Sequence, residues 1–352
     1  MILYPIMTIE ELLQRVRKAG MDEGTVLSYG ATPLAEHAAR QGQDPGPWLD
    51  ALFDFVSILH TREISLWSPL HFTIEPLAKA AGGDVGLFVD LLDATRDLLM
   101  DLRDRDIDTT RTEQYGVGAA AAAFVGDGLN LLRSLRFARP LVAKKQDPGW
   151  FLQLTLPAMK SDAGFEKKLN ALSAFLAPLL DRGVFSSYPL AVGLGTVAKI
   201  MSAEDPWARA LDLLGAMVKS LDAAKVVGLF RGGLEELPTD LIPPDRLIRA
   251  LTVAVALADR GVDPAPTLRR GALSPESLAV AEKLTAEGGD PAPVLAGDFQ
   301  IYEALGLLNR GGEGLIGLAL ALGPRRGKGE RFFEGAIPAV AALEAETPGG
   351  GE

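Results

Sequence analysis

Three histidines lie near one another in the sequence and could hold a metal ion. His37 and His71 flank the segment His60-Thr61-Arg62-Glu63, which places an imidazole and a carboxylate on one face if it is helical. Such ligands suit divalent Zn, Fe or Mn. The candidate metal site is therefore His37, His60, Glu63 and His71. The alternative is that these are surface or partly buried side chains of an acidic region, in which case we expect no cofactor.

A run of aspartates at 90–108 could hold Mg²⁺ together with a phosphorylated substrate. Four of them share one helical face, namely Asp93, Asp97, Asp101 and Asp104. Three arginines interleave with these aspartates, which is typical of a solvated helix surface with ion pairs. The pattern favours such a solvated face over a metal site.

The clearest basic cluster of the chain lies at 323–331, in the sequence GPRRGKGER. Its cations are Arg325, Arg326, Lys328 and Arg331. They could bind an anion, a phosphate or an acidic partner surface, or they could belong to a loop between two helices. The segment is one residue short of a P-loop and has no Ser or Thr after the lysine.

The sequence offers little for catalysis. The chain has no cysteine, which excludes thiolate nucleophiles and disulfides, and it contains no Gly-x-Ser-x-Gly motif. The pair Gly116-x-Gly118 begins like a dinucleotide-binding fingerprint, but the preceding DTTRTEQY is a poor strand. We expect these glycines to permit close helix packing instead.

A repeated phrase indicates the elements that position these residues. The sequence Gly-x-Asp-Pro-x-Pro-x-Leu occurs at 261–268 and again, as Gly-Gly-Asp-Pro-Ala-Pro-Val-Leu, at 288–295. Glycine in the left-handed conformation ends a helix. Aspartate then caps the next helix, and proline suits its first position. The phrase predicts a tight junction between two helices.

Related junctions recur along the chain, at Asp44, Asp84, Asp147 and Asp205, without a fixed period. A capping box at Thr8–Glu11 and leucine stripes at helical spacing agree with them. We therefore predict an all-α fold of antiparallel helical hairpins. These hairpins stack as an irregular α-solenoid, similar in general architecture to HEAT-type arrays, or form a large helical bundle.

The glycine- and proline-rich stretch 231–245 predicts two blocks, an N-terminal helical block at 1–232 and a C-terminal helical block at 233–346. Residues 347–352 are expected to be a disordered tail. The net charge is −11, and residues 1–108 hold most of it. This charge disfavours nucleic acid as a partner.

No segment has the roughly 18 apolar residues that a transmembrane helix requires, and the N-terminus lacks the pattern of a signal peptide. We therefore expect a cytoplasmic protein. Regular helix capping without a convergent catalytic set predicts a non-catalytic scaffold that binds a protein or peptide partner. The alternative is a helical enzyme or cofactor protein that uses the histidine and carboxylate cluster. The oligomeric state is left open.

Overall fold

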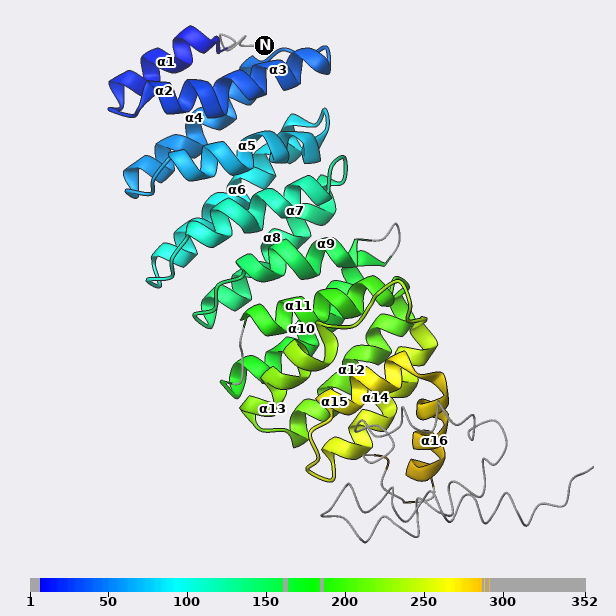
Figure 1. Cartoon of the computed structure of the whole chain (residues 1–352). Helices are drawn as coiled ribbons and strands as arrows, with labels where there is room; N and C mark the ends of the chain where they lie inside the picture. Colours follow the sequence, from blue (N-terminus) through cyan, green and yellow to red (C-terminus); the bar gives the residue numbers. More distant parts are fainter. Residues whose placement is uncertain (1–6, 161–163, 184–186, 287, 289–290, 292–352) are drawn as a thin grey trace, which may run out of the picture. The chain divides into compact units, whose positions relative to one another are not determined.

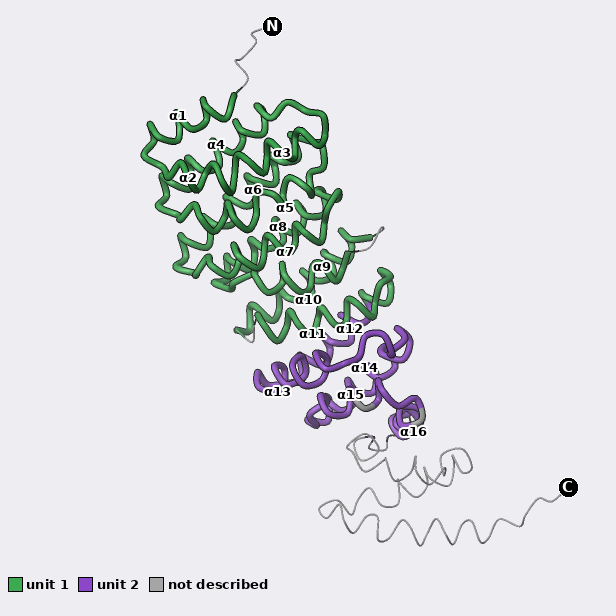
Figure 2. The backbone as a smooth tube through the Cα atoms, turned by 45° about the horizontal axis from the view of Figure 1, so that its top comes forward, with its two compact units in different colours: residues 1–208 green, residues 209–352 purple. Residues whose placement is uncertain are grey.

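The computed structural model describes residues 7–160, 164–183, 187–286, 288 and 291. Every regular element in these residues is helical, as the sequence predicts, and none is a strand (Figure 1). The chain divides into two compact units, Met1–Ala208 and Arg209–Glu352 (Figure 2). We describe each unit separately. None of the described helices is both long enough and apolar enough to span a membrane.

The first unit contains two sets of helices. Each helix of the first set packs on the next one along the chain. The set consists of α1 (Ile9–Lys18), α4 (Gly46–Thr61), α6 (Val85–Arg103), α8 (Gly128–Ala143) and α10 (Phe165–Asp181). These helices bury leucine-rich faces, such as Leu91, Leu98 and Leu102 of α6, and their polar faces are solvated.

The second set alternates with the first along the chain, and its members also contact one another in order. Three members carry a π-helical turn. The set consists of α2–η1–α3 (Glu23–Val26, Leu27–Ala31, Thr32–Arg40), α5 (Trp67–Ala81), η2–α7 (Thr112–Val117, Gly118–Ala123), η3–α9 (Phe151–Thr155, Leu156–Met159) and α11 (Ser187–Ile200).

The second unit has the same kind of packing on a smaller scale. Helix α12 (Glu204–Ser220) crosses the division between the units. After it come α13 (Ala223–Gly228), η4 (Leu229–Leu234), α14 (Pro244–Ala258), α15 (Ala265–Leu273) and α16 (Pro275–Ala286). Helices α14, α15 and α16 contact one another, and η4 packs on α13 and α15.

Helix ends follow the predicted capping chemistry at most junctions. The Thr8–Glu11 capping box is present at α1, and Asp84 caps α6 by accepting from Leu87 N at 3.0 Å. Gly42 and Gly261 adopt positive φ angles of 66° and 74°. Asp44 and Asp263 each accept a hydrogen bond from the amide two residues later, at 2.9 and 3.0 Å.

One of the predicted junctions lies inside a helix. Asp205 belongs to the first turn of α12, which begins one residue earlier at Glu204. Thr32 begins α3 with Pro33 in its first turn, although α2, η1 and α3 follow one another without a break. Thr32 N donates to Leu27 O, five residues earlier, and this π-helical turn accommodates Pro33, which has no N–H of its own.

Glycines allow close approach within the second set of helices, as expected for the segment after residue 115. A Cβ atom on Gly116 would lie 3.1 Å from the Cα of Gly149, and one on Gly118 would collide with the carbonyl oxygen of Phe72. A Cβ atom on Gly195 would lie 3.0 Å from the carbonyl oxygen of Leu154. Because glycine has only a hydrogen atom in place of a side chain, the backbones of neighbouring helices come into direct contact at these positions.

Candidate partner-binding surface

The histidines predicted to bind a metal lie in different environments. His37 on α3 is buried, and its Nε2 lies 2.7 Å from the carbonyl oxygen of Gly82 at the end of α5. Its ring also meets the edge of the buried Trp48 ring, at 5.0 Å between centroids. The imidazole of His37 therefore connects α3 with α4, through Trp48, and with the end of α5, through Gly82.

His60 and Glu63 belong to the end of α4 and the following turn. Both side chains are exposed, and Glu63 has a positive φ of 56°. Arg103 of α6 donates to the Glu63 carbonyl at 2.7 Å and pairs with its carboxylate at 3.4 Å. In the described part of the chain, no group of three or more His, Cys, Asp or Glu side chains is placed to hold a metal ion. The structure therefore does not assemble the predicted metal site.

The third histidine, His71 of α5, belongs to an aromatic group. It stacks on Trp67 at 5.2 Å between centroids, with 14° between the ring planes. Tyr29 of η1 meets His71 edge-on at 4.6 Å. This group joins two neighbouring helices of the second set.

A second aromatic group continues on the next three helices of that set. The guanidinium carbon of Arg111 lies 3.8 Å from the ring centroid of Trp150 and 5.8 Å from that of Tyr115. Trp150 in turn meets the edge of Tyr188 at 4.6 Å. The cation thus bridges two rings from different helices, and a third helix contributes the next ring.

We call these two groups together the aromatic row. It comprises Tyr29, Trp67, His71, Arg111, Tyr115, Trp150 and Tyr188. Some of its members lie near the amino-terminal ends of α5 and α11. The others lie in or next to the π-helical turns η1, η2 and η3. These residues come from five consecutive members of the second set, and those members contact one another in order. Figure 1 shows the helices that carry them.

The row is unusual because it leaves large aromatic side chains in solvent. Trp67 is 45% exposed, Tyr115 is 50% exposed and Tyr188 is 37% exposed. The chain has only five tyrosines and four tryptophans. The three tyrosines in the described residues all belong to the row, whereas Trp48 and Trp207 are buried. Tyrosine, tryptophan and arginine are the residues enriched at binding hot spots.

Local hydrogen bonds and π-helical turns position the row. Asp147 accepts from the Thr112 hydroxyl and from Gly149 N, both at 2.8 Å, so it fixes the start of the rod that carries Trp150 beside Arg111. Tyr29 and Tyr115 lie within η1 and η2. A π-helical turn rotates the following residues relative to a regular helix, and such turns are frequent at functional sites.

Two buried ionisable groups near these elements have shifted pKa values. Burial raises the pKa of Glu113 in η2, and the nearby Asp108 acts in the same direction. Burial lowers the pKa of Lys168 in α10, although Glu204 acts against this shift. Lys168 donates from Nζ to the Ser202 carbonyl, and its own carbonyl accepts from Trp207 Nε1 at 3.1 Å. These contacts give Lys168 a structural role between α10 and α12.

The aspartate-rich face of α6 is a network of ion pairs, as predicted. Arg96 pairs with Asp93 at 2.5 Å and with Asp97 at 2.9 Å. Arg139 of α8 pairs with Asp101 at 2.8 Å, so the network also links neighbouring helices. The basic cluster of Arg325, Arg326, Lys328 and Arg331 lies outside the described residues.

Comparison with known proteins identifies no relative for this chain. No family model matches it, and neither the curated proteins nor the solved structures searched give a significant match. The case for a function therefore depends on the chain's own residues. Of the aromatic row, only His71 was among the functional residues predicted from the sequence. The scarcity of tyrosine and tryptophan was a signal that could have drawn attention to it.

Proposed function

We propose that this protein is a non-catalytic helical-repeat scaffold of the cytoplasm that binds a protein or peptide partner through the aromatic row. The observation that carries the proposal is the exposure of Trp67, Tyr115 and Tyr188, which lie on three members of one set of helices that contact one another in order. Exposed apolar surface of this kind, rimmed by polar residues, is typical of interaction sites. Cysteine-free composition agrees with a reducing compartment.

The finer architecture that we propose is an α-solenoid of helical hairpins. The helices α4, α6, α8, α10 and α12 begin at residues 46, 85, 128, 165 and 204, with spacings of 37 to 43 residues. Side-chain hydrogen bonds between distant residues of the described part join positions 33 to 45 apart. The helix spacing and the sequence separation of these hydrogen bonds are thus similar. This similarity supports a repeat of about 40 residues in which each unit contacts only its neighbours.

The chemistry of the row favours a polypeptide ligand. Tyrosine and tryptophan offer large, rigid contact areas with one polar atom each, so they can pack on apolar side chains and still hydrogen-bond to a backbone. Arg111 adds a cation whose guanidinium is already held against two rings, so little further ordering is needed on binding. An enzymatic function of His37, His60, Glu63 and His71 stays a prediction for which the described residues supply no shared site.

Panning a phage-displayed random peptide library against the immobilised full-length protein would test the proposal. We expect enrichment of peptides that lose at least about tenfold in affinity for the double variant Trp67→Ala/Tyr115→Ala, since each ring is a candidate hot spot. The matched control is Val125→Ala/Leu129→Ala, because these side chains are also exposed but lie outside the row. Circular dichroism checks that both variants fold.

The control should retain wild-type affinity for the selected peptides. Equal binding by the wild type and the Trp67→Ala/Tyr115→Ala variant would show that the row is not the binding surface. A library that yields no enriched peptide under several salt conditions would also count against the proposal.

A further inference from the structure

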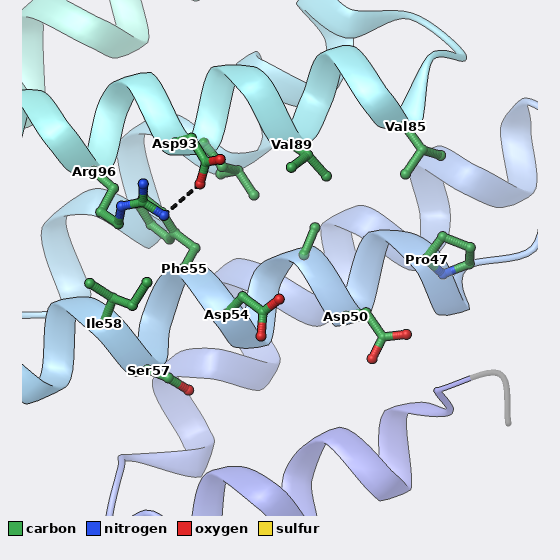
Figure 3. A pocket seen from close by; sticks show the side chains of 12 residues that line it. Pro47, Asp50, Asp54, Phe55, Ser57, Ile58, Val85, Val89, Asp93 and Arg96 are labelled. Atoms are coloured by element: carbon green, nitrogen blue, oxygen red, sulfur yellow. Dashed lines mark hydrogen bonds and ion pairs between the residues drawn. The ribbon is translucent and has the colours of Figure 1, made fainter. Parts of the chain in front are cut away.

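An apolar groove of about 780 Å³ lies between α4 and α6 (Figure 3). Phe55 and Ile58 of α4 and Val85, Val89 and Leu92 of α6 supply most of its apolar lining. Phe55 and Leu92 are buried, whereas Val89 is exposed. The groove therefore has an apolar floor, and solvent reaches Val89 and, in part, Ile58 and Val85.

Carboxylates line the same groove. Asp50 and Asp54 are one helical turn apart on α4, and Asp93 lies on α6 (Figure 3). The guanidinium of Arg96 also lines the groove, but its nitrogens already pair with Asp93 and Asp97, at 2.5 and 2.9 Å. The remaining charge of the groove is negative.

The two aspartates of α4 are available to a ligand to different degrees. Asp50 lies 3.7 Å from Arg15 of α1, and both side chains are about half exposed, so this pair contributes little. Asp54 has neither an ion pair nor a hydrogen bond among the described residues. A cation that approaches Asp54 therefore gains a partner without breaking another pair.

We propose that this groove binds a basic amphipathic segment of a partner protein. Its apolar side chains would pack on Phe55 and Val89, and its lysines or arginines would pair with Asp50 and Asp54. From Pro47 to Ile58 the groove wall extends about 16 Å along α4, which equals about three turns of a docked helix. Residues four apart on such a helix have the same spacing as Asp50 and Asp54.

This inference is independent of the aromatic row, because the row belongs to the second set of helices and the groove to the first. The charge of the groove disfavours acidic peptides and nucleic acid as occupants. No group of three or more potential ligands among the described residues is placed to hold a metal ion, and the cation that we propose for this groove is a basic side chain.

The test is fluorescence anisotropy with the full-length protein and a fluorescein-labelled 14-residue peptide of leucine and lysine, ordered to form an amphipathic helix. Two matched probes are a peptide with every lysine replaced by glutamate and a scrambled peptide of the original composition. We expect saturable binding of the first probe, none of the glutamate probe, and binding of the scrambled probe several-fold weaker. If the scrambled peptide bound as tightly as the leucine–lysine peptide, the groove would not be selective for an amphipathic helix, which would contradict the proposal.

Variants then locate the binding site. Asp50→Asn/Asp54→Asn should weaken binding of the leucine–lysine peptide by about tenfold, through the loss of two charge pairs. The control Asp212→Asn removes one charge from an exposed position of α12 and should leave affinity within about twofold. Wild-type affinity of the Asp50→Asn/Asp54→Asn variant would overturn the proposal. Trp67→Ala/Tyr115→Ala should bind this probe normally, which separates the two proposals.

Two other occupants would give distinct results. If charge reversal of Arg325, Arg326 and Lys328 raises the affinity of the protein for the probe, the chain's own basic segment competes for the groove. If Asp50→Asn/Asp54→Asn converts a dimer to a monomer in analytical ultracentrifugation, the occupant is a second copy. Either result would replace the partner segment that we propose.

Discussion

Glu113 shows how one buried side chain makes stability depend on pH. It is buried in η2, and burial raises the pKa of its carboxyl group above the ordinary value. Between the unfolded and folded pKa values, the folded protein binds more protons than the unfolded chain. The free energy of unfolding therefore falls as the pH rises through the folded pKa, and above that pKa the charged carboxylate destabilises the fold.

The substitution Glu113→Gln should consequently raise the free energy of unfolding at pH values above the folded pKa of Glu113. The gain should shrink as the pH falls from the folded pKa towards the unfolded pKa, because the carboxyl group of the folded wild type then becomes protonated. Urea denaturation followed by circular dichroism between pH 4 and 8 measures this. Glu10→Gln, at an exposed position of α1, is the control and should change little. A gain from Glu113→Gln that does not vary with pH would rule out this explanation.

The histidines and the row illustrate what residue types alone could predict. The chain has no cysteine, which excludes thiol chemistry, and none of the described helices could span a membrane. Proximity in sequence suggested a metal set, but His37 and His71 lie on helices that present them to different neighbours, Trp48 and Trp67. Which side chains share a surface depends on how the helices pack. For this reason the row, whose members are far apart in sequence, could not be found from local spacing.

At the scale of elements, glycine contacts set how closely helices approach. Gly118→Ala would place a methyl group against the carbonyl oxygen of Phe72, which belongs to the backbone of α5. The expected loss of stability is about 1–3 kcal/mol, the usual cost of overpacking. Alanine has a higher helix propensity than glycine, so helix propensity alone would predict a gain of stability instead of this loss.

Gly228→Ala is the matched control, because Gly228 also lies in a helix but has no atom within 4 Å of its would-be Cβ. This variant should gain up to about 1 kcal/mol. Chemical denaturation of both variants under the same conditions measures the difference. Equal effects of the two substitutions would show that contact with Phe72 does not limit the approach of these helices.

Helix termini were easier to predict than helix interiors. Capping at Thr8 and Asp84 depends on bonds to amides within three residues, so the sequence contains the needed information. Thr32-Pro33 carries the same local signal, yet the preceding rod continues through it by way of η1. There, Gly30 packs against Leu52 of α4. Tertiary packing of this kind, which local sequence does not record, decides between a break and a π-helical turn.

At the scale of the whole molecule, the contacts of each helix are mostly with its neighbours in order. Helix α4, for example, packs on α1, α3 and α6. If the proposed repeat architecture holds, the free energy of unfolding is approximately the sum of the stabilities of the individual repeats and of the interfaces between neighbouring repeats. Damage at one position should then remain local, unlike damage to a bundle with a single shared core.

Leu52→Ala tests this expectation, since Leu52 of α4 is fully buried. Removing its side chain should cost about 2–5 kcal/mol locally. Hydrogen–deuterium exchange measured by mass spectrometry should show faster exchange in α3, α4 and α6, while peptides from α10 and α11 exchange as in the wild type. Exchange that accelerates equally in every helix would mean that the first unit unfolds as one cooperative body. The proposed repeat architecture would then be wrong, although the observed contacts between helices would be unaffected.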